Sequence, residues 1–314
     1  MIVAASGQEL IGKYEQKKRG NEKLLGMIGG HVPENTAETI GMCGTWLLVA
    51  TSRGLERKKL LSSNFCKNRF CPMCAWRKAC KDALRLMVLL AYIRQEYSKE
   101  FVFLTLTAPN VAAADLAVEI SRYNQNFRKL IKRDGVARVV KGYIRKLEVT
   151  YNSKRDDYHP HFHVLLAVNA SYFTDRTYIK HERWLELWQQ AMGDESITQV
   201  DVRKLKSDTG NEVRELAKYA AKDGDYLLTQ AVFDVFYWTL KGRQVVTYSR
   251  LFTEANKLYK GKKLDYLKKQ DEVEYVYRLL YRWGIEGYGL ESLRKLTDAE
   301  KVRAVMAAVL DMEE

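Results

Sequence analysis

The sequence predicts an α+β protein with antiparallel strands at its centre and a mostly helical C-terminal part. Three observations lead to this prediction. The run FVFLTLT is β-branched and aromatic and stops before Pro109. Two further β-rich runs flank the polar turn NSKRDD, and apolar residues recur at helical spacing before and after these runs. With 46% hydrophobic and 29% charged residues in 314, the chain has the composition of a folded globular protein.

The elements follow in order along the chain. The first 75 residues show no clear periodicity and are expected to be irregular. Strands are expected over residues 101–107, 142–151, 159–168 and 197–202. Helices are expected over residues 76–97, 110–132, 182–190, 212–222, 229–239, 250–259, 273–281 and 298–310.

The charge of the chain favours a polyanionic partner. The formal net charge is +13 and the pI is about 9.3, so nucleic acid is the first expectation. The longest uncharged apolar run, Leu86–Ile93, is far shorter than the ~20 residues that a membrane-spanning helix needs. No secretory signal is visible at the N-terminus, so a cytoplasmic protein without a membrane partner is expected.

Five cysteines in a chain without an export signal indicate metal binding rather than a disulfide framework. Cys66, Cys71 and Cys74 form a compact group, and Cys43 upstream is the candidate fourth ligand. Zinc prefers four such ligands in a tetrahedron, so these residues predict a structural Zn²⁺ site. Cys80 lies beyond the turn and is not expected to be a ligand. The alternative is a set of buried cysteines without a metal.

Histidines are concentrated in the run HPHFHVLL. His161 and His163 lie on one face of a strand because side chains alternate along it. If the hairpin folds about its middle, Glu148 lies opposite His161 and the three side chains could hold a divalent cation. His159 lies on the same face and is the rival third ligand. A non-haem iron site and ordinary surface histidines remain alternatives.

A tyrosine lies in the run EVRELAKYAAKDGDYL. Glu215 and Tyr219 are four residues apart and would share a helix face, with Lys218 and Lys222 on a neighbouring stripe. A tyrosine beside a polarised phosphate can act as a nucleophile, and a carboxylate one turn away can activate water. Taken alone, this motif is more typical of a core or surface tyrosine. Tyr226 is a second candidate nucleophile.

Several ordered blocks together resemble the replication initiators of small rolling-circle plasmids, the Gram-positive type within the HUH endonuclease superfamily. The blocks are FCKNRFCPMCAWR, FLTLTAPNV, GYIRKLEVTYN with HPHFHVLL, and ELAKYAAKDGDYL. The resemblance extends over residues 13–264. It implies a central antiparallel sheet flanked by helices, the HUH palm, with the histidines on a central strand.

The resemblance also implies an activity, that of a DNA nickase and strand transferase. His161 and His163 match the metal-binding pair, with Glu148 as third ligand of Mg²⁺ or Mn²⁺. Tyr219 matches the nucleophile that forms a 5′-phosphotyrosine and frees a 3′-hydroxyl primer, and Glu215 matches the acid that activates water at termination. The implied partners are double-stranded origin DNA, its single-stranded nick site, and a host helicase with the replication machinery.

Three parts of the chain are expected on this basis. They are an N-terminal basic region with a zinc module (1–97), an HUH endonuclease domain (98–230) and a mostly helical C-terminal region (231–314). Phosphate contacts from basic side chains would supply affinity for DNA. The candidates are Arg69, Arg77, Lys78, Arg122, Arg128, Lys129, Lys132, Lys218 and Lys222.

Other classes of protein explain part of the pattern. A non-catalytic, zinc-containing DNA-binding regulator accounts for the charge and the cysteines but leaves the histidine hairpin without a role. An iron oxygenase accounts for two histidines and a carboxylate but not for the basic charge. Within the HUH superfamily, a transposase or a relaxase is the alternative to an initiator.

Overall fold

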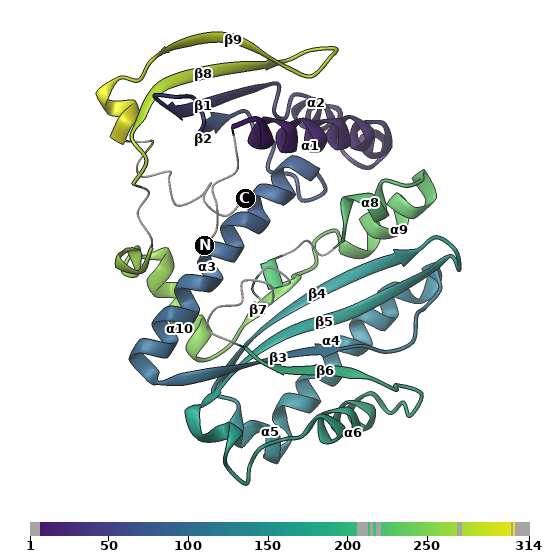
Figure 1. Ribbon diagram of the computed structural model, residues 1–314. Helices are drawn as coiled ribbons and strands as arrows, with labels where there is room; N and C mark the ends of the chain where they lie inside the picture. The colour runs from purple at the N-terminus through teal and green to yellow at the C-terminus, as the bar shows by residue number, and fades with distance from the viewer. Residues whose placement is uncertain are drawn as a thin grey trace. The chain divides into compact units, whose positions relative to one another are not determined.

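The computed structural model describes residues 7–205, 213, 216, 217, 221–268, 272–302 and 304. The chain divides into two compact units, and each contains an antiparallel sheet (Figure 1). One unit combines residues 1–84 with 268–314, and the other consists of residues 85–267. We call them the terminal unit and the central unit. The predicted α+β class, with antiparallel strands and helices, is confirmed.

The central unit contains a five-stranded sheet in the order β6-β3-β5-β4-β7. All neighbouring strands are antiparallel. The middle strand, β5, is buried along almost its whole length, as expected for a strand covered on both faces. The strands are β3 (Lys99–Leu106), β4 (Gly142–Asn152), β5 (Asp157–Asn169), β6 (Val200–Lys204) and β7 (Val246–Tyr248).

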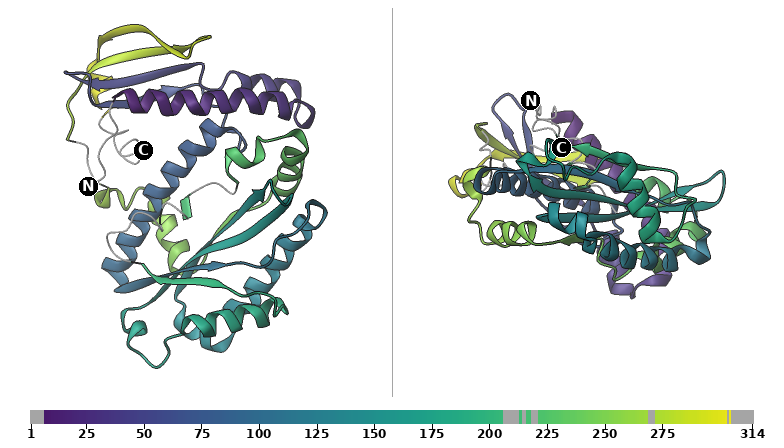
Figure 2. Two further views of the ribbon diagram at one scale, coloured as in Figure 1. Left: turned by 45° about the vertical axis from the view of Figure 1, so that its right-hand side comes forward. Right: turned by 90° about the horizontal axis from the view of Figure 1, so that it is seen from below.

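One face of this sheet, which we call the helical face, is covered by α4 (Leu116–Lys132) and α6 (His181–Met192) (Figures 1 and 2). Tyr123 of α4 meets Phe162 of β5 edge-on, with ring centroids 5.4 Å apart. Trp188 of α6 is fully buried and its ring lies 5.5 Å from that of Tyr123. The apolar stripe of α4 therefore packs on the even-numbered side chains of β5.

The other face carries the odd-numbered side chains of β5, and we call it the histidine face. At one end it is covered by the second half of α3 (Pro72–Tyr97) and by α10 (Leu251–Lys260). Phe252 and Arg94 pack on Phe101 at 5.9 and 5.1 Å. Phe101 pairs with Ala167 near the end of β5, so the predicted ligands lie toward the opposite end of the strand. The other described α-helices of this unit are α5 (Asp134–Val139), α8 (Asp223–Tyr226) and α9 (Gln230–Leu240).

The terminal unit contains a four-stranded sheet in the order β2-β1-β8-β9. Its strands are β1 (Trp46–Ser52), β2 (Lys58–Ser63), β8 (Tyr275–Trp283) and β9 (Tyr288–Lys295), and its first helices are α1 (Gly7–Ile28) and α2 (Glu34–Gly41). The expectation of irregular structure over the first 75 residues was therefore wrong. The apolar stripe of α1 was missed because buried polar residues interrupt it, and β1 pairs with a strand more than 200 residues away.

The C-terminal part is less helical than expected. The predicted helices over 229–239 and 250–259 are confirmed as α9 and α10, and a helix begins at residue 298 as expected. The predicted helix over 273–281, however, is wrong, because residues 275–281 belong to strand β8. In the run YVYRLLYRW, Tyr275, Tyr277, Tyr281 and Trp283 alternate with other residues, which is the period of a strand. In the described part of the chain, no helix is long and apolar enough to cross a membrane.

Candidate functional site

Three of the predicted ligands converge on the histidine face. Glu148 of β4 pairs with His161 of β5, as the hairpin argument predicted, and His163 lies two residues further along β5. The Nε2 atom of His163 lies 3.2 Å from both Glu148 Oε2 and His161 Nε2, and the third separation is 3.8 Å. Ligands about 2.1 Å from one ion are roughly 3.0 Å apart at right angles and roughly 3.4 Å apart in a tetrahedron. The three atoms could therefore bind one metal ion.

The second nitrogen of each imidazole also has a partner. His163 Nδ1 lies 3.3 Å from the Thr105 hydroxyl on the neighbouring strand β3, and His161 Nδ1 lies 3.3 Å from the backbone oxygen of His159. Such contacts orient the rings and keep the Nε2 atoms directed toward Glu148. The sheet itself therefore positions these donor atoms.

Burial and the neighbouring side chains shift the pKa of the Glu148 carboxyl in opposite directions. Glu148 is 3% exposed, and burial by itself would raise the pKa of its carboxyl. The hydrogen bond with His163 and the charge of Lys146 outweigh burial and lower that pKa to about 2. Burial also lowers the pKa of His161 to about 4. The group thus combines an ionised carboxylate with a neutral imidazole at pH 7, which is the protonation that metal binding requires.

His159 has a different set of contacts. Its Nδ1 atom lies 2.8 Å from Asn110 Oδ1, in the loop after β3, and burial lowers its pKa. Among the described residues, the group of converging donor atoms contains Glu148, His161 and His163 but not His159. The geometry therefore favours Glu148 over the rival ligand.

The four predicted cysteines also converge, in the terminal unit. Cys43 Sγ lies 3.6 Å from Cys74 Sγ and from Cys71 Sγ, and Cys66 Sγ lies 3.6 Å from Cys74 Sγ. A tetrahedron with zinc–sulfur bonds of about 2.3 Å has edges of about 3.8 Å. The sulfur atoms are therefore too far apart for disulfides and at the separations that a four-thiolate metal site requires. Cys80 is outside this group, as expected.

Several N–H groups point at the cysteine sulfurs. The backbone N–H of Lys67 donates to Cys74 Sγ at 3.1 Å, and the backbone N–H of Cys66 donates to Cys43 Sγ at 3.4 Å. Such donors stabilise thiolates. Hydrogen bonding with Cys43 lowers the pKa of Cys66 and raises that of Cys71, so the four thiols are electrostatically coupled.

Sequence reasoning missed two polar residues of α1 that accompany the cysteines. Asn21 is fully buried and donates to Cys71 Sγ at 3.4 Å. Lys18 is 2% exposed and donates to Asn21 Oδ1 at 3.1 Å and to the backbone oxygen of Gly41 at 2.8 Å. Burial lowers the pKa of Lys18, although the charges of Glu22 and of the cysteines oppose this. These residues interrupt the buried apolar stripe of α1, and that interruption was the available signal.

The candidate catalytic helix is only partly described. Tyr219, Glu215 and Lys218 lie outside the described residues. Within the same stretch, Val213, Leu216 and Ala217 are helical and buried. The rival nucleophile Tyr226 belongs to α8, is 4% exposed and packs on Phe233 and Phe236 of α9.

The predicted DNA-binding residues fall into different environments. Arg122 holds Glu119 at 2.8 Å and Asp194 at 3.3 Å, and it thereby joins α4 to the end of α6. Arg77 lies over the ring of Phe65 at 4.4 Å, and Lys78 forms an ion pair with Asp82. The exposed members are Arg69, Lys78, Arg128, Lys129, Lys132 and Lys222.

The exposed α4 residues among the predicted DNA contacts lie on the opposite side of the sheet from the converging ligands. Arg128, Lys129 and Lys132 project from the helix that covers the helical face, and none takes part in an ion pair among the described residues. A strand of DNA at the Glu148 group would therefore not reach them without passing around the sheet.

Comparisons with known proteins agree with the motifs. Residues 57–288 match the family model Rep_1, described as replication protein. "Protein rep" of Staphylococcus aureus is 53% identical over 70% of this chain and 96% of its own length. "Protein rep" of Bacillus amyloliquefaciens is 34% identical over 77% of this chain and 80% of its own length. No solved structure matches significantly. From the ordered motifs, the converging ligands and these matches, we conclude that the chain belongs to the Rep_1 family of replication proteins.

Proposed function

We propose that this chain initiates rolling-circle replication of a plasmid by nicking one strand of the origin in a metal-dependent reaction. The convergence of Glu148, His161 and His163 carries the proposal. Two imidazoles and a carboxylate on a sheet face are a donor set suited to a catalytic divalent ion. Membership of a replication protein family supports DNA as the substrate.

The proposed chemistry is a transesterification at a DNA phosphate. Mg²⁺ or Mn²⁺ held by Glu148, His161 and His163 would polarise the scissile phosphate and offset its developing charge. The phenolic oxygen of Tyr219 attacks the phosphorus and loses its proton. The bond to the 3′ oxygen breaks, that oxygen takes up a proton, and a 5′-phosphotyrosine and a 3′-hydroxyl primer result.

Termination would use the neighbouring carboxylate. Glu215 accepts a proton from a water molecule that attacks the phosphotyrosine, the bond to the Tyr219 oxygen breaks, and that oxygen takes up a proton while the DNA keeps a 5′ phosphate. Hydrolysis in place of a second tyrosine attack suits a protein that acts once per replicated circle. The burial of Tyr226, whose ring packs on Phe233 and Phe236, supports Tyr219 as the nucleophile, because a side chain that is 4% exposed offers a phosphate little access.

We propose that Cys43, Cys66, Cys71 and Cys74 hold a structural zinc ion. Thiolates at tetrahedral separations suit zinc, and the amide and N–H donors around them suit a negatively charged metal–sulfur cluster. The ion would tie the end of α2, the turn before α3 and the first turn of α3 together. Exposed Arg69 in that turn is a candidate phosphate contact.

The remaining DNA contacts are proposed from exposure and charge. Arg128, Lys129 and Lys132 would contact double-stranded origin DNA on the helical face, and Lys218 and Lys222 would contact the nick-site strand. A host helicase and the host replication machinery are the further partners. The sequence contains no GxxxxGK[ST] loop with which the chain could itself use ATP.

Covalent capture tests the proposal. The protein is mixed with Mn²⁺ and a randomised single-stranded DNA pool labelled at the 3′ end, and labelled protein is sought on a denaturing gel. We expect a labelled band with the unchanged protein and with Tyr226→Phe, and none with Tyr219→Phe. A band that persists in Tyr219→Phe would refute this nucleophile. If this pool gives no band and supercoiled origin DNA is not relaxed, the chain does not nick DNA and the proposal fails.

A further inference from the structure

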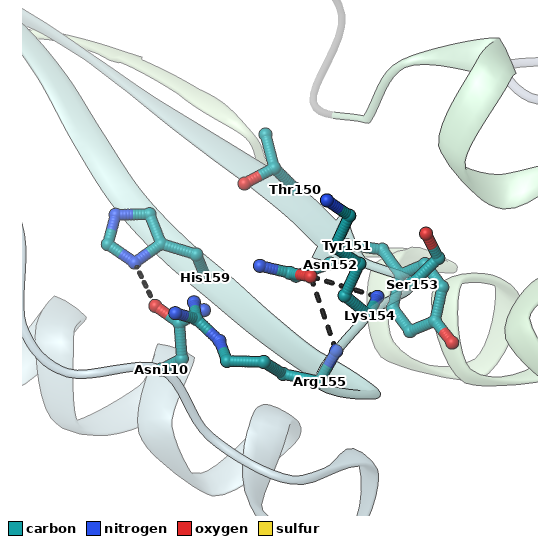
Figure 3. A pocket seen from close by; sticks show the side chains of 8 residues that line it. All are labelled: Asn110, Thr150, Tyr151, Asn152, Ser153, Lys154, Arg155 and His159. Carbon is teal, nitrogen blue, oxygen red and sulfur yellow. Dashed lines mark hydrogen bonds between the residues drawn. The ribbon is translucent and has the colours of Figure 1, made fainter.

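The tip of the β4–β5 hairpin forms a pocket beyond the converging ligands (Figure 3). Its volume is about 520 Å³, within the range of small-molecule sites. Residues 150–155 line it together with His159 and Asn110. None of these lining residues is acidic, and Lys154 and Arg155 contribute two cationic side chains.

The pocket continues the histidine face. Thr150 pairs with His159, and this is the next pair on that face after Glu148 and His161. Two residues along a strand span roughly 7 Å. The rings of His159 and His161 have centroids 5.2 Å apart. A group bound in the pocket would therefore adjoin a phosphate held at the Glu148 group.

A chain of hydrogen bonds orients His159. The Asp157 carboxylate can only accept, so the group that contacts its Oδ1 atom at 2.7 Å is the Asn110 amide nitrogen. The Asn110 oxygen therefore faces His159 and accepts from Nδ1–H at 2.8 Å. In this tautomer Nε2 carries a lone pair and can accept a hydrogen bond. Figure 3 shows this second nitrogen on the side of the ring away from Asn110.

The charges at the turn suit a phosphate. Arg155 is exposed and its Nε atom lies 2.9 Å from Asp157, so part of its charge is offset. Lys154 is exposed and forms no ion pair among the described residues. Its backbone N–H donates to Asn152 Oδ1 at 3.0 Å, which holds the turn in shape. The pocket thus combines an exposed cationic side chain at the turn with the imidazole of His159, which Asn110 holds in one orientation.

We propose that this pocket binds the nucleotide next to the scissile phosphate, with Lys154 at its phosphate and His159 Nε2 accepting from an exocyclic amino group of its base. The proposal rests on the proposed function, since it assumes single-stranded DNA at the Glu148 group. Adenine and cytosine present such amino groups and thymine does not. His159 would then be a specificity-determining residue rather than a metal ligand.

DNA binding measured without a divalent ion, so that no nicking can take place, tests the pocket separately from the proposed reaction. Fluorescent dA, dC and dT decamers are titrated in EDTA with the full chain and with the variants His159→Ala and Lys154→Glu. We expect Lys154→Glu to weaken binding of all three roughly tenfold, from the loss and reversal of one phosphate contact. Lys263→Glu is the matched control, because Lys263 is exposed beyond α10, away from the hairpin tip, and should change binding less than twofold.

His159→Ala should reduce the preference for dA and dC over dT, while His181→Ala, a histidine bonded to the backbone oxygen of Val200, should not. Binding of Mn²⁺ to His159→Ala, measured by electron paramagnetic resonance, should stay unchanged. Loss of Mn²⁺ binding would instead make His159 a ligand and overturn the inference. Unaltered DNA affinity in Lys154→Glu, or an unaltered base preference in His159→Ala, would also overturn it.

Covalent capture then separates the two proposals. If the captured DNA shows thymine disfavoured at one position beside the nick, and His159→Ala removes that bias alone, both proposals hold. If no covalent product forms from any DNA while the EDTA titrations respond as expected, the pocket stands and the nicking proposal fails. If capture proceeds and the base profile is the same in His159→Ala, the nicking proposal stands and the pocket inference fails.

Discussion

At the scale of single residues, buried charged and polar side chains accompany both candidate centres. Glu148 and Lys146 are 3% and 2% exposed on a sheet that is otherwise largely apolar at this depth. In the terminal unit, Lys18 and Asn21 interrupt the apolar stripe of α1 beside the cysteines. Burying a polar group costs free energy unless it is paired, so such residues persist where a ligand or a reaction requires them.

Replacing Glu148 by Gln tests its role as a ligand. Gln keeps the size of the side chain and removes the charge, so Mn²⁺ affinity should fall at least about tenfold in a titration followed by electron paramagnetic resonance. Glu119→Gln is the control, since Glu119 is also a buried glutamate of the central unit but pairs with Arg122 in α4. Equal affinity of both variants and the unchanged protein would contradict the assignment.

At the scale of elements, those set by short-range sequence patterns could be predicted, whereas those set by long-range strand pairing could not. The β4–β5 hairpin was predictable with its register, because a short polar turn and a period of two determine which side chains face each other. Strand β8 was not predictable, because its partner β1 lies far away in the sequence. The bulky residues of β8 also occur at helical spacing, which favoured a helix. The helix that begins at residue 298 was predictable from its first turn.

That first turn is a capping box. Thr297 Oγ1 accepts from the Glu300 backbone N–H at 3.3 Å, and Glu300 Oε2 accepts from the Thr297 N–H at 2.9 Å. The hydrogen bonds from Arg294 are the main cause that lowers the pKa of Glu300 from 4.5 to about 2. Because the folded-state pKa is the lower one, the stabilisation is present above about pH 4.5 and is lost as the pH falls toward 2.

We therefore expect Glu300→Gln, which keeps the cap but removes the charge, to speed hydrogen exchange over residues 288–302 at pH 7. The difference from the unchanged protein should shrink at pH 3, after correction for intrinsic exchange rates. Glu291→Gln is the control, because Glu291 of β9 forms an exposed pair with Arg282 of the neighbouring strand β8 and not with Arg294. A difference of the same size at both pH values would argue against the carboxylate as the cause.

At the scale of the whole molecule, the described residues place one candidate metal centre in each compact unit. The cysteines lie in the terminal unit and the Glu148 group lies in the central unit. The terminal unit is assembled from both ends of the chain, whereas the central unit is one continuous segment. The family match over residues 57–288 includes the whole central unit and part of the terminal unit.

Removal of the cysteine-bound metal should therefore act on one unit only. Zinc should copurify with the chain, and a strong chelator should speed amide exchange in α1, α2 and β1. Exchange in β3, β4 and β5 should stay slow, because those strands belong to a separate core. Equal loss of protection in both sheets, or a metal-free protein that keeps its protection, would contradict a structural zinc site in the terminal unit.

The sequence by itself determined the α+β class, the hairpin with Glu148 opposite His161, and the grouping of Cys66, Cys71 and Cys74. In each case the residues are close in the chain, so alternation or short spacing sets their geometry. Only the tertiary structure decided that β1 pairs with β8, that Lys18 and Asn21 accompany the cysteines, and that Asn110 orients His159. Those contacts join segments far apart in the chain, and their partners are selected by packing and hydrogen bonding that no local pattern encodes.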